Sequence, residues 1–227
     1  MIGIPMSSEM CHRKFMQSLL SLQYPANAEI DINIVSGYQL PFARNKIVQD
    51  ALKKNCDYLF FIDADMVFPH DSLIKLLKHD VDIVNALAFR RIAPYYPCIF
   101  KWDAEKKCYE TIDYSGNPRG LLSVDATGMP CILINLDIFR KMTPPYYYYR
   151  DHLFSSDLTF CENVKKLGYS IWVDTSLQIG HISEEIVVDE SFYLNHLQPE
   201  EKEKWNAGMT QNLEKHYATE KELYDRK

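Results

Sequence analysis

Two carboxylates, Asp63 and Asp65, follow the apolar run Tyr-Leu-Phe-Phe-Ile at positions 58–62. The run is typical of a buried strand, and side chains two residues apart on an extended segment point to the same side. Hard divalent cations take oxygen ligands gathered in this way and keep positions open for phosphate. The pair therefore predicts a metal site for a diphosphate at the carboxyl edge of a sheet, although Asp at a strand end is also a common turn former.

The surrounding chain predicts the elements that would position this pair. Apolar runs predict strands at residues 1–4, 30–35, 58–62, 82–87, 131–135 and 169–174. Apolar residues at helical spacing predict helices at residues 15–22, 43–55, 71–77, 136–141 and 156–167, the last ended by Gly168. Because strands and helices alternate, we expect an α/β fold with a Rossmann-like, mostly parallel central sheet.

Three parts of the sequence depart from this alternation. Residues 95–124 form short segments divided by turn residues, which predicts a small antiparallel ribbon beside the sheet. Residues 143–150, with four consecutive tyrosines, indicate either a packed surface loop or a loop that a ligand orders. Mixed charges at helical spacing after residue 190 are typical of solvated helices. We expect one domain over residues 1–190 and a helical C-terminal extension over residues 191–227, packed on or beside it.

Composition limits the expected partners and compartment. The chain of 227 residues has 25 Lys and Arg against 31 Asp and Glu, a formal charge of -6, so nucleic acid is not expected to bind. Its six cysteines are scattered without a Cys-x-x-Cys pair, which favours a reducing compartment and no structural zinc. Neither a signal peptide nor an apolar run of roughly 20 residues is present, so we expect no membrane span and a cytoplasmic protein.

Several short motifs occur in a fixed order along the chain. They are Ile4-Pro5, Ala43-Arg44-Asn45, Phe61-Ile62-Asp63-Ala64-Asp65-Met66, Thr127-Gly128-Met129, Ser156-Asp157-Leu158-Thr159-Phe160, Lys166-Leu167-Gly168-Tyr169 and Gly180-His181. In this order they resemble the family 2-like glycosyltransferases of the GT-A fold, over most of residues 1–183. The resemblance implies transfer of a sugar from a nucleotide-sugar, by default a UDP-sugar, to a hydroxyl of a glycan, lipid or protein acceptor, with inversion at the anomeric carbon.

The resemblance also implies a metal site and a general base. Asp63 and Asp65, with His181 as a further ligand, would hold Mn²⁺ or Mg²⁺ against the diphosphate, where the cation stabilises the charge that develops as the sugar–phosphate bond breaks. Asp157 would take the proton of the acceptor hydroxyl, with Asp151 as a nearby substitute. Each has a structural explanation too, since His181 could be a hydrogen-bonded loop residue and Asp157 an ordinary first-turn carboxylate.

The implied nucleotide-sugar contacts come from four separate parts of the chain. They are Pro5, Ser7, Arg44, Asp63 and Gly128, although Arg44 could also be a surface residue at a helix start. Two positions depart from the family pattern. Ser156 stands where relatives often carry Glu, and Ser36-Gly37 stands where an acidic residue often reads uracil, so the base is uridine by analogy alone.

Two other functions remain open from the sequence. Asp63-Ala64-Asp65-Met66-Val67 also fits the Asp-x-Asp-x-Val signature of haloacid dehalogenase-like phosphatases, in which Asp63 would be the nucleophile. That family needs a later lysine and carboxylate cluster and places this strand first, which does not match here. The third alternative is a catalytically inactive protein that binds a sugar or nucleotide.

Overall fold

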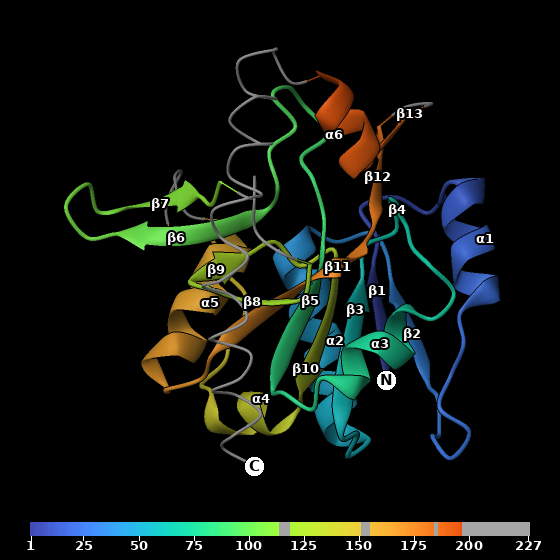
Figure 1. Ribbon diagram of the computed structural model, residues 1–227. Helices are drawn as coiled ribbons and strands as arrows, with labels where there is room; N and C mark the ends of the chain where they lie inside the picture. Colours follow the sequence, from blue (N-terminus) through green and yellow to red (C-terminus); the bar gives the residue numbers. More distant parts are fainter. Residues whose placement is uncertain (114–118, 151–154, 184–185, 197–227) are drawn as a thin grey trace.

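The computed structural model describes residues 1–113, 119–150, 155–183 and 186–196. Its centre is a seven-stranded sheet in the order β2-β1-β3-β10-β5-β11-β8 (Figure 1). The strands are β1 (Ile2–Pro5), β2 (Ile32–Val35), β3 (Tyr58–Ile62), β5 (Ile83–Leu87), β8 (Leu121–Val124), β10 (Cys131–Asn135) and β11 (Ile171–Gln178). Of these, β10 and β8 run against the direction that the other five share. The predicted mostly parallel α/β sheet is confirmed.

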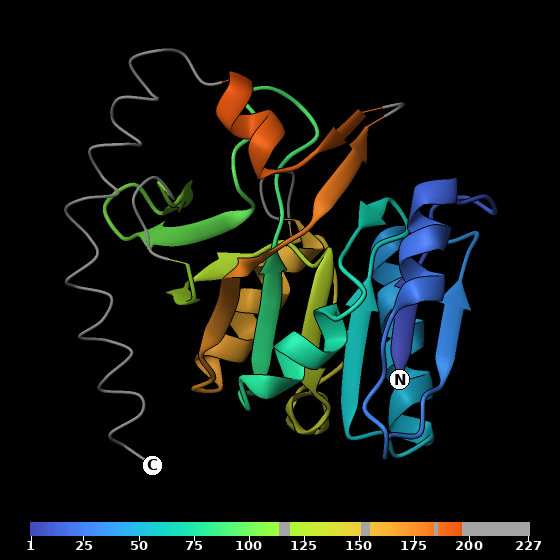
Figure 2. The same ribbon diagram turned by 45° about the vertical axis from the view of Figure 1, so that its right-hand side comes forward.

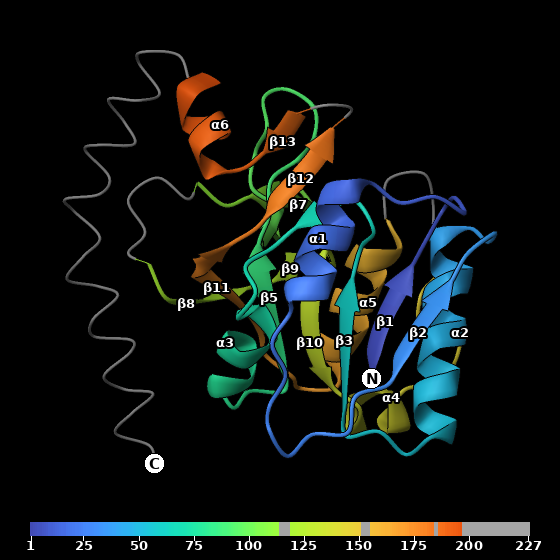
Figure 3. The same ribbon diagram turned by 90° about the vertical axis from the view of Figure 1, so that its right-hand side faces the viewer.

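Helices cover both faces of this sheet (Figure 2 and Figure 3). They are α1 (Arg13–Ser21), α2 (Leu40–Lys53), α3 (Ser72–Lys78), α4 (Asp137–Lys141) and α5 (Ser156–Lys166). In β3, Leu59 and Phe61 join the core under α2, α4 and α5, whereas Phe60 and Ile62 join the core under α1 and α3. Burial on both faces explains why the strand before Asp63 is apolar throughout.

Two small sheets lie beside the main one. The first has the order β13-β12-β4 and consists of β4 (Met66–Val67), β12 (Gly180–Ser183) and β13 (Ile186–Val188). The second has the order β7-β6-β9 and consists of β6 (Ile99–Asp103), β7 (Cys108–Thr111) and β9 (Ala126–Thr127). The antiparallel pair of β6 and β7 confirms the predicted ribbon. The prediction was wrong for residues 121–124, because β8 pairs with β11, a partner distant in sequence, at the edge of the main sheet.

The described chain ends in a short helix, α6 (Glu190–His196). This helix packs on the domain, since the ring of Tyr193 stacks on Phe89 with centroids 5.3 Å apart. The remainder of the predicted C-terminal extension, residues 197–227, lies outside the described residues. None of the helices in the described ranges combines the length and apolar character that a bilayer crossing requires.

Candidate functional site

The carboxyl ends of the parallel strands bring several of the predicted site residues to one edge of the sheet. Pro5 ends β1, and Asp63 follows the neighbouring strand β3, whose register pairs Phe61 with Gly3. The loop that contains Gly128 enters β10 at this same edge, where the Asp63 backbone N–H donates to the carbonyl of Pro130 at 3.0 Å. Ser7, two residues beyond β1, is exposed.

The two carboxylates of the Asp-x-Asp segment do not share an extended strand. β3 ends at Ile62, and the Met66 N–H donates to the Asp63 carbonyl at 3.2 Å, so residues 63–66 form a turn into β4. The expectation of an extended segment was wrong here, because the chain must reverse to place β4 beside β12. As a result, Asp63 and Asp65 face different partners.

Asp63 is bound to a buried arginine. The Arg44 side chain, on α2, is 0% exposed, and its Nη2 donates to both carboxylate oxygens of Asp63 at 3.1 and 3.2 Å. Its Nη1 donates to Oδ1 of Asp157. Arg44 is therefore not a surface residue: it joins the predicted base to a predicted metal ligand. Its Nε is buried and has no partner among the described residues.

Burial and the neighbouring opposite charge have opposite effects on the pKa values of Asp63 and Arg44. Burial raises the pKa of Asp63 to about 6, because Arg44 offsets only part of the desolvation and both Asp65 and Asp157 add repulsion. Burial also opposes charge on Arg44, but Asp157 and Asp63 outweigh it and raise the pKa of the guanidinium. Arg44 therefore stays charged and holds the two carboxylates beside each other.

Asp65 lies against His181 on β12. The Ile182 N–H donates to the Asp65 carbonyl at 2.8 Å, which fixes the turn, and Nε2 of His181 lies 3.2 Å from Oδ2 of Asp65. Nη1 of Arg91 also lies 3.2 Å from this oxygen. Burial would raise the pKa of Asp65, but the hydrogen bond and charge of His181, followed by Arg91, outweigh it and lower the pKa.

Asp65 and His181 fit part of a divalent cation site. Nδ1 of His181 lies 2.9 Å from the Phe89 carbonyl, which can only accept, so Nδ1 carries the proton. Nε2 therefore either donates a proton to Asp65 or, when it carries none, offers a lone pair to a cation that Asp65 also binds, as in metal-binding histidines held by a backbone carbonyl. Across the described ranges no group of three or more His, Cys, Asp or Glu side chains is arranged around a metal position. Asp63, bound to Arg44, does not complete such a group.

Asp157 occupies the first turn of α5. The helix is capped by Ser155, whose Oγ accepts from the Leu158 N–H at 3.4 Å, so Asp157 is not needed as the cap. Oδ1 of Asp157 accepts from Arg44 and, at 3.2 Å, from the Ser156 hydroxyl. Among the described residues nothing donates to Oδ2. Asp151, the substitute base, lies outside the described residues.

The tyrosine run contributes a site residue that the sequence did not assign. Tyr147 is buried, its ring lies 5.8 Å from the Arg44 guanidinium carbon, and it stacks on Phe160 at 4.9 Å. Asn45, next to Arg44, fixes this loop: its Oδ1 accepts from the Tyr146 N–H at 2.8 Å and its Nδ2 donates to the Tyr147 carbonyl at 2.6 Å. The motif Ala43-Arg44-Asn45 therefore supplies the arginine and also holds Tyr147, the aromatic residue beside it.

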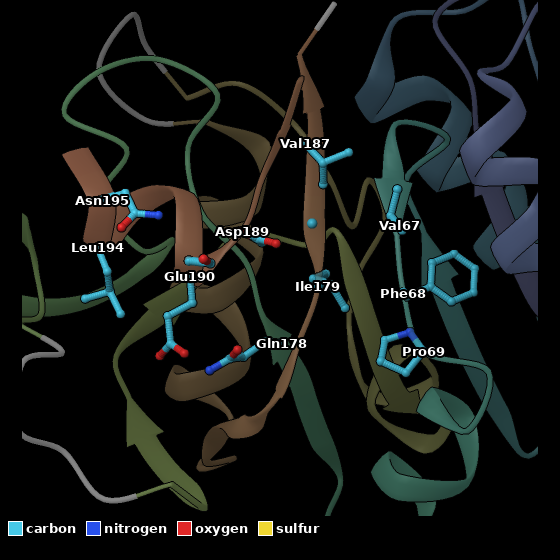
Figure 4. Close-up of a pocket in the computed structure, with 12 residues that line it drawn as sticks. Val67, Phe68, Pro69, Gln178, Ile179, Val187, Asp189, Glu190, Leu194 and Asn195 are labelled. Carbon is cyan, nitrogen blue, oxygen red and sulfur yellow. The ribbon is translucent and has the colours of Figure 1, made fainter. Parts of the chain in front are cut away.

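A cavity of about 550 Å³ lies on the other side of the β4–β12–β13 sheet (Figure 4). Gly180 and Val187 line it with residues of α6 and of the segment after β4. Neighbouring residues on a strand point to opposite faces, so His181 faces away from this cavity. A Cβ on Gly180 would lie 2.2 Å from a Val187 methyl, so glycine lets the hairpin close here. The cavity shares strands with the Asp65–His181 pair but not the same face.

Comparison with known proteins identifies the fold alone. No protein-family model matches the chain. No curated protein matches it either. Among solved structures, it is similar to A197 from STIV, with a TM-score of 0.60 and 17% sequence identity over 84% of this chain and 90% of that chain. The two proteins therefore share an α/β fold.

Proposed function

We propose that this chain is a GT-A-type glycosyltransferase, similar to family 2, that moves a sugar from a nucleotide-sugar to an acceptor hydroxyl. One observation carries the proposal: Arg44 joins Asp157 to Asp63 at the carboxyl edge of the sheet, next to the Asp65–His181 pair. Ligands of open α/β sheets bind at this edge. The A197 likeness agrees with the fold and adds nothing on the donor.

Asp65 and His181 are the residues that would hold Mn²⁺ or Mg²⁺. Two protein ligands suit such a cation when phosphate oxygens and water complete its coordination. The bound cation supplies electrostatic stabilisation to a departing diphosphate. Asp63 adds negative charge to the same region, and its bond to Arg44 keeps it oriented.

Asp157 is the proposed general base. Its Oδ1 is fixed by Arg44 and Ser156, so Oδ2 is the oxygen that accepts the proton of the acceptor hydroxyl. The hydroxyl oxygen then attacks the anomeric carbon in line with the bond to the diphosphate, which inverts that carbon. Arg44 orients the base through its hydrogen bond to Oδ1.

The test is nucleoside diphosphate release from a panel of nucleotide-sugars in the presence of Mn²⁺, measured with and without acceptor mixtures. Asp157→Asn should abolish transfer but spare donor binding, whereas Asp65→Asn should weaken Mn²⁺-dependent donor binding. Asp137→Asn removes an exposed carboxylate on α4 and is the matched control, expected to behave as wild type.

Three outcomes would contradict the proposal. Transfer that persists in Asp157→Asn removes the base assignment. Release of inorganic phosphate with covalent trapping at Asp63 indicates the phosphatase alternative, although the charged groups that act on Asp63 are Arg44, Asp65 and Asp157 rather than a lysine. Donor binding without any turnover across the panel indicates an inactive binding protein.

A further inference from the structure

The loop between β5 and β6, here called the arginine loop (residues 88–98), reaches over the Asp65–His181 pair. Its base is closed by backbone hydrogen bonds, from the Cys98 N–H to the Ala88 carbonyl at 2.8 Å and from the Arg90 N–H to the Tyr96 carbonyl at 2.9 Å. These bonds leave residues 91–95 as the tip. The base of the arginine loop is therefore fixed, and only its short tip projects.

Aromatic contacts hold the arginine loop against α6. The ring of Tyr95 lies 4.9 Å from Phe192 and 5.5 Å from His196, and Phe89 stacks on Tyr193. The carbonyl of Phe89 also fixes the His181 ring. The same backbone thus orients the candidate metal ligand and carries the two arginines that follow it in sequence.

Arg91, at the tip of the arginine loop, contacts Asp65. Its Nη1 lies 3.2 Å from the Asp65 oxygen that His181 also approaches, while its side chain remains 52% exposed. A single contact of an exposed guanidinium contributes little to stability and is readily exchanged. Arg90 differs, because its guanidinium carbon lies 5.7 Å from the Phe100 ring centroid, over the ribbon.

A guanidinium and a divalent cation cannot share the Asp65 oxygen without repulsion unless an anion lies between them. A diphosphate meets this requirement, and guanidinium groups bind phosphate oxygens in a bidentate way. We infer that Arg91 is a diphosphate-binding residue, which leaves Asp65 when the cation binds and holds the phosphates on the side opposite the metal. This inference rests on the proposed function and adds a ligand that no sequence motif assigned.

The test measures binding of inorganic pyrophosphate by the full chain, by titration calorimetry with and without Mn²⁺. Arg91→Ala should weaken pyrophosphate binding in Mn²⁺ about 10- to 100-fold, the size of a lost charge-assisted bidentate contact. The pyrophosphate affinity of Arg91→Lys should lie between those of wild type and Arg91→Ala, because an ammonium offers one point contact. Arg90→Ala makes the same change in net charge one residue away, so it is the matched control and should lose less than about threefold.

A second readout separates direct binding from a structural role. Without pyrophosphate, Arg91→Ala should bind Mn²⁺ at least as tightly as wild type in electron paramagnetic resonance titrations, because a competing cation has left Asp65. A structural defect would weaken both ligands together. Thermal denaturation should show similar midpoints for all these variants, since both arginines are exposed.

Each result decides between the inference and the proposed function. If wild type binds pyrophosphate, Asp65→Asn does not, and Arg91→Ala equals Arg90→Ala, the inference is wrong while the proposed function stands. Weaker Mn²⁺ binding in Arg91→Ala also overturns the inference. If wild type binds no pyrophosphate with or without Mn²⁺, both fall.

Discussion

Replacement of Arg44 by Met should destabilise the domain severely. The Arg44 side chain is 0% exposed, and those of Asp63 and Asp157 are 23% and 21% exposed, so the variant would leave two largely buried carboxylates without a counter-charge. Loss of one partner from a buried ion pair costs about 3–5 kcal/mol. For a domain of this size, each kcal/mol lowers the melting temperature by about 2–4 °C. The expected decrease is therefore about 6–20 °C.

Differential scanning calorimetry of three variants tests this reasoning. Arg140→Met is the matched control, because Arg140 pairs with Asp137 at the surface, where an ion pair contributes about 0–1 kcal/mol. Adding Asp157→Asn to Arg44→Met should recover part of the loss, since it removes one of the two unpaired charges. Equal losses in Arg44→Met and Arg140→Met, or a further loss in the double variant, would refute the view that Arg44 neutralises the site.

Two further predictions concern the strands that frame the site. Gly180→Ala should cost about 1–3 kcal/mol in urea unfolding, because the new Cβ would lie 2.2 Å from a Val187 methyl and must push the hairpin apart. Burial opposes ionisation of Asp174, but hydrogen bonds from His79 and Ser176 outweigh it and lower the pKa. Its stabilising contribution should therefore be complete above the ordinary Asp pKa of 3.8 and disappear as the pH falls further, so wild type and Asp174→Asn should converge in stability at low pH.

Controls sharpen both of these measurements. Gly128→Ala tests the same chemical change at a position where the nearest atom to a new Cβ lies 3.5 Å away, and it should fold with little loss. A similar loss in the two glycine variants would contradict the packing argument. A stability difference between wild type and Asp174→Asn that stays constant from pH 7 to pH 3 would contradict the assigned pKa direction.

Local sequence patterns were sufficient to predict six of the seven strands of the main sheet, all except β8, and the edge at which the candidate site residues gather. The run before Asp63 is apolar because β3 is buried on both faces, and this signal lies within the strand itself. Gly168 adopts a φ of +88° after α5, as its place after the helical pattern predicted. By contrast, β12 and β13 are short, and the other partner of β12 is the two-residue strand β4, so periodicity could not reveal the sheet that carries His181.

The arrangement within the site depends on contacts between distant parts of the chain. Arg44 lies near the start of a helix, where exposure is common. It is buried because it packs beside Tyr147 and pairs with Asp63 and Asp157, which are distant in sequence. The contact of Asp65 with Arg91 has no motif, because it depends on how the arginine loop folds back. Residue types thus indicated the candidate site residues, and packing determined their partners.

Soaking crystals with Mn²⁺ and UDP shows whether Asp65 and His181 bind the cation that holds the diphosphate. We expect anomalous difference density for manganese beside Oδ2 of Asp65 and Nε2 of His181, with the diphosphate against it at the carboxyl edge of the sheet. Manganese and nucleotide bound elsewhere, with the Asp65–His181 pair unchanged, would contradict the proposed metal site.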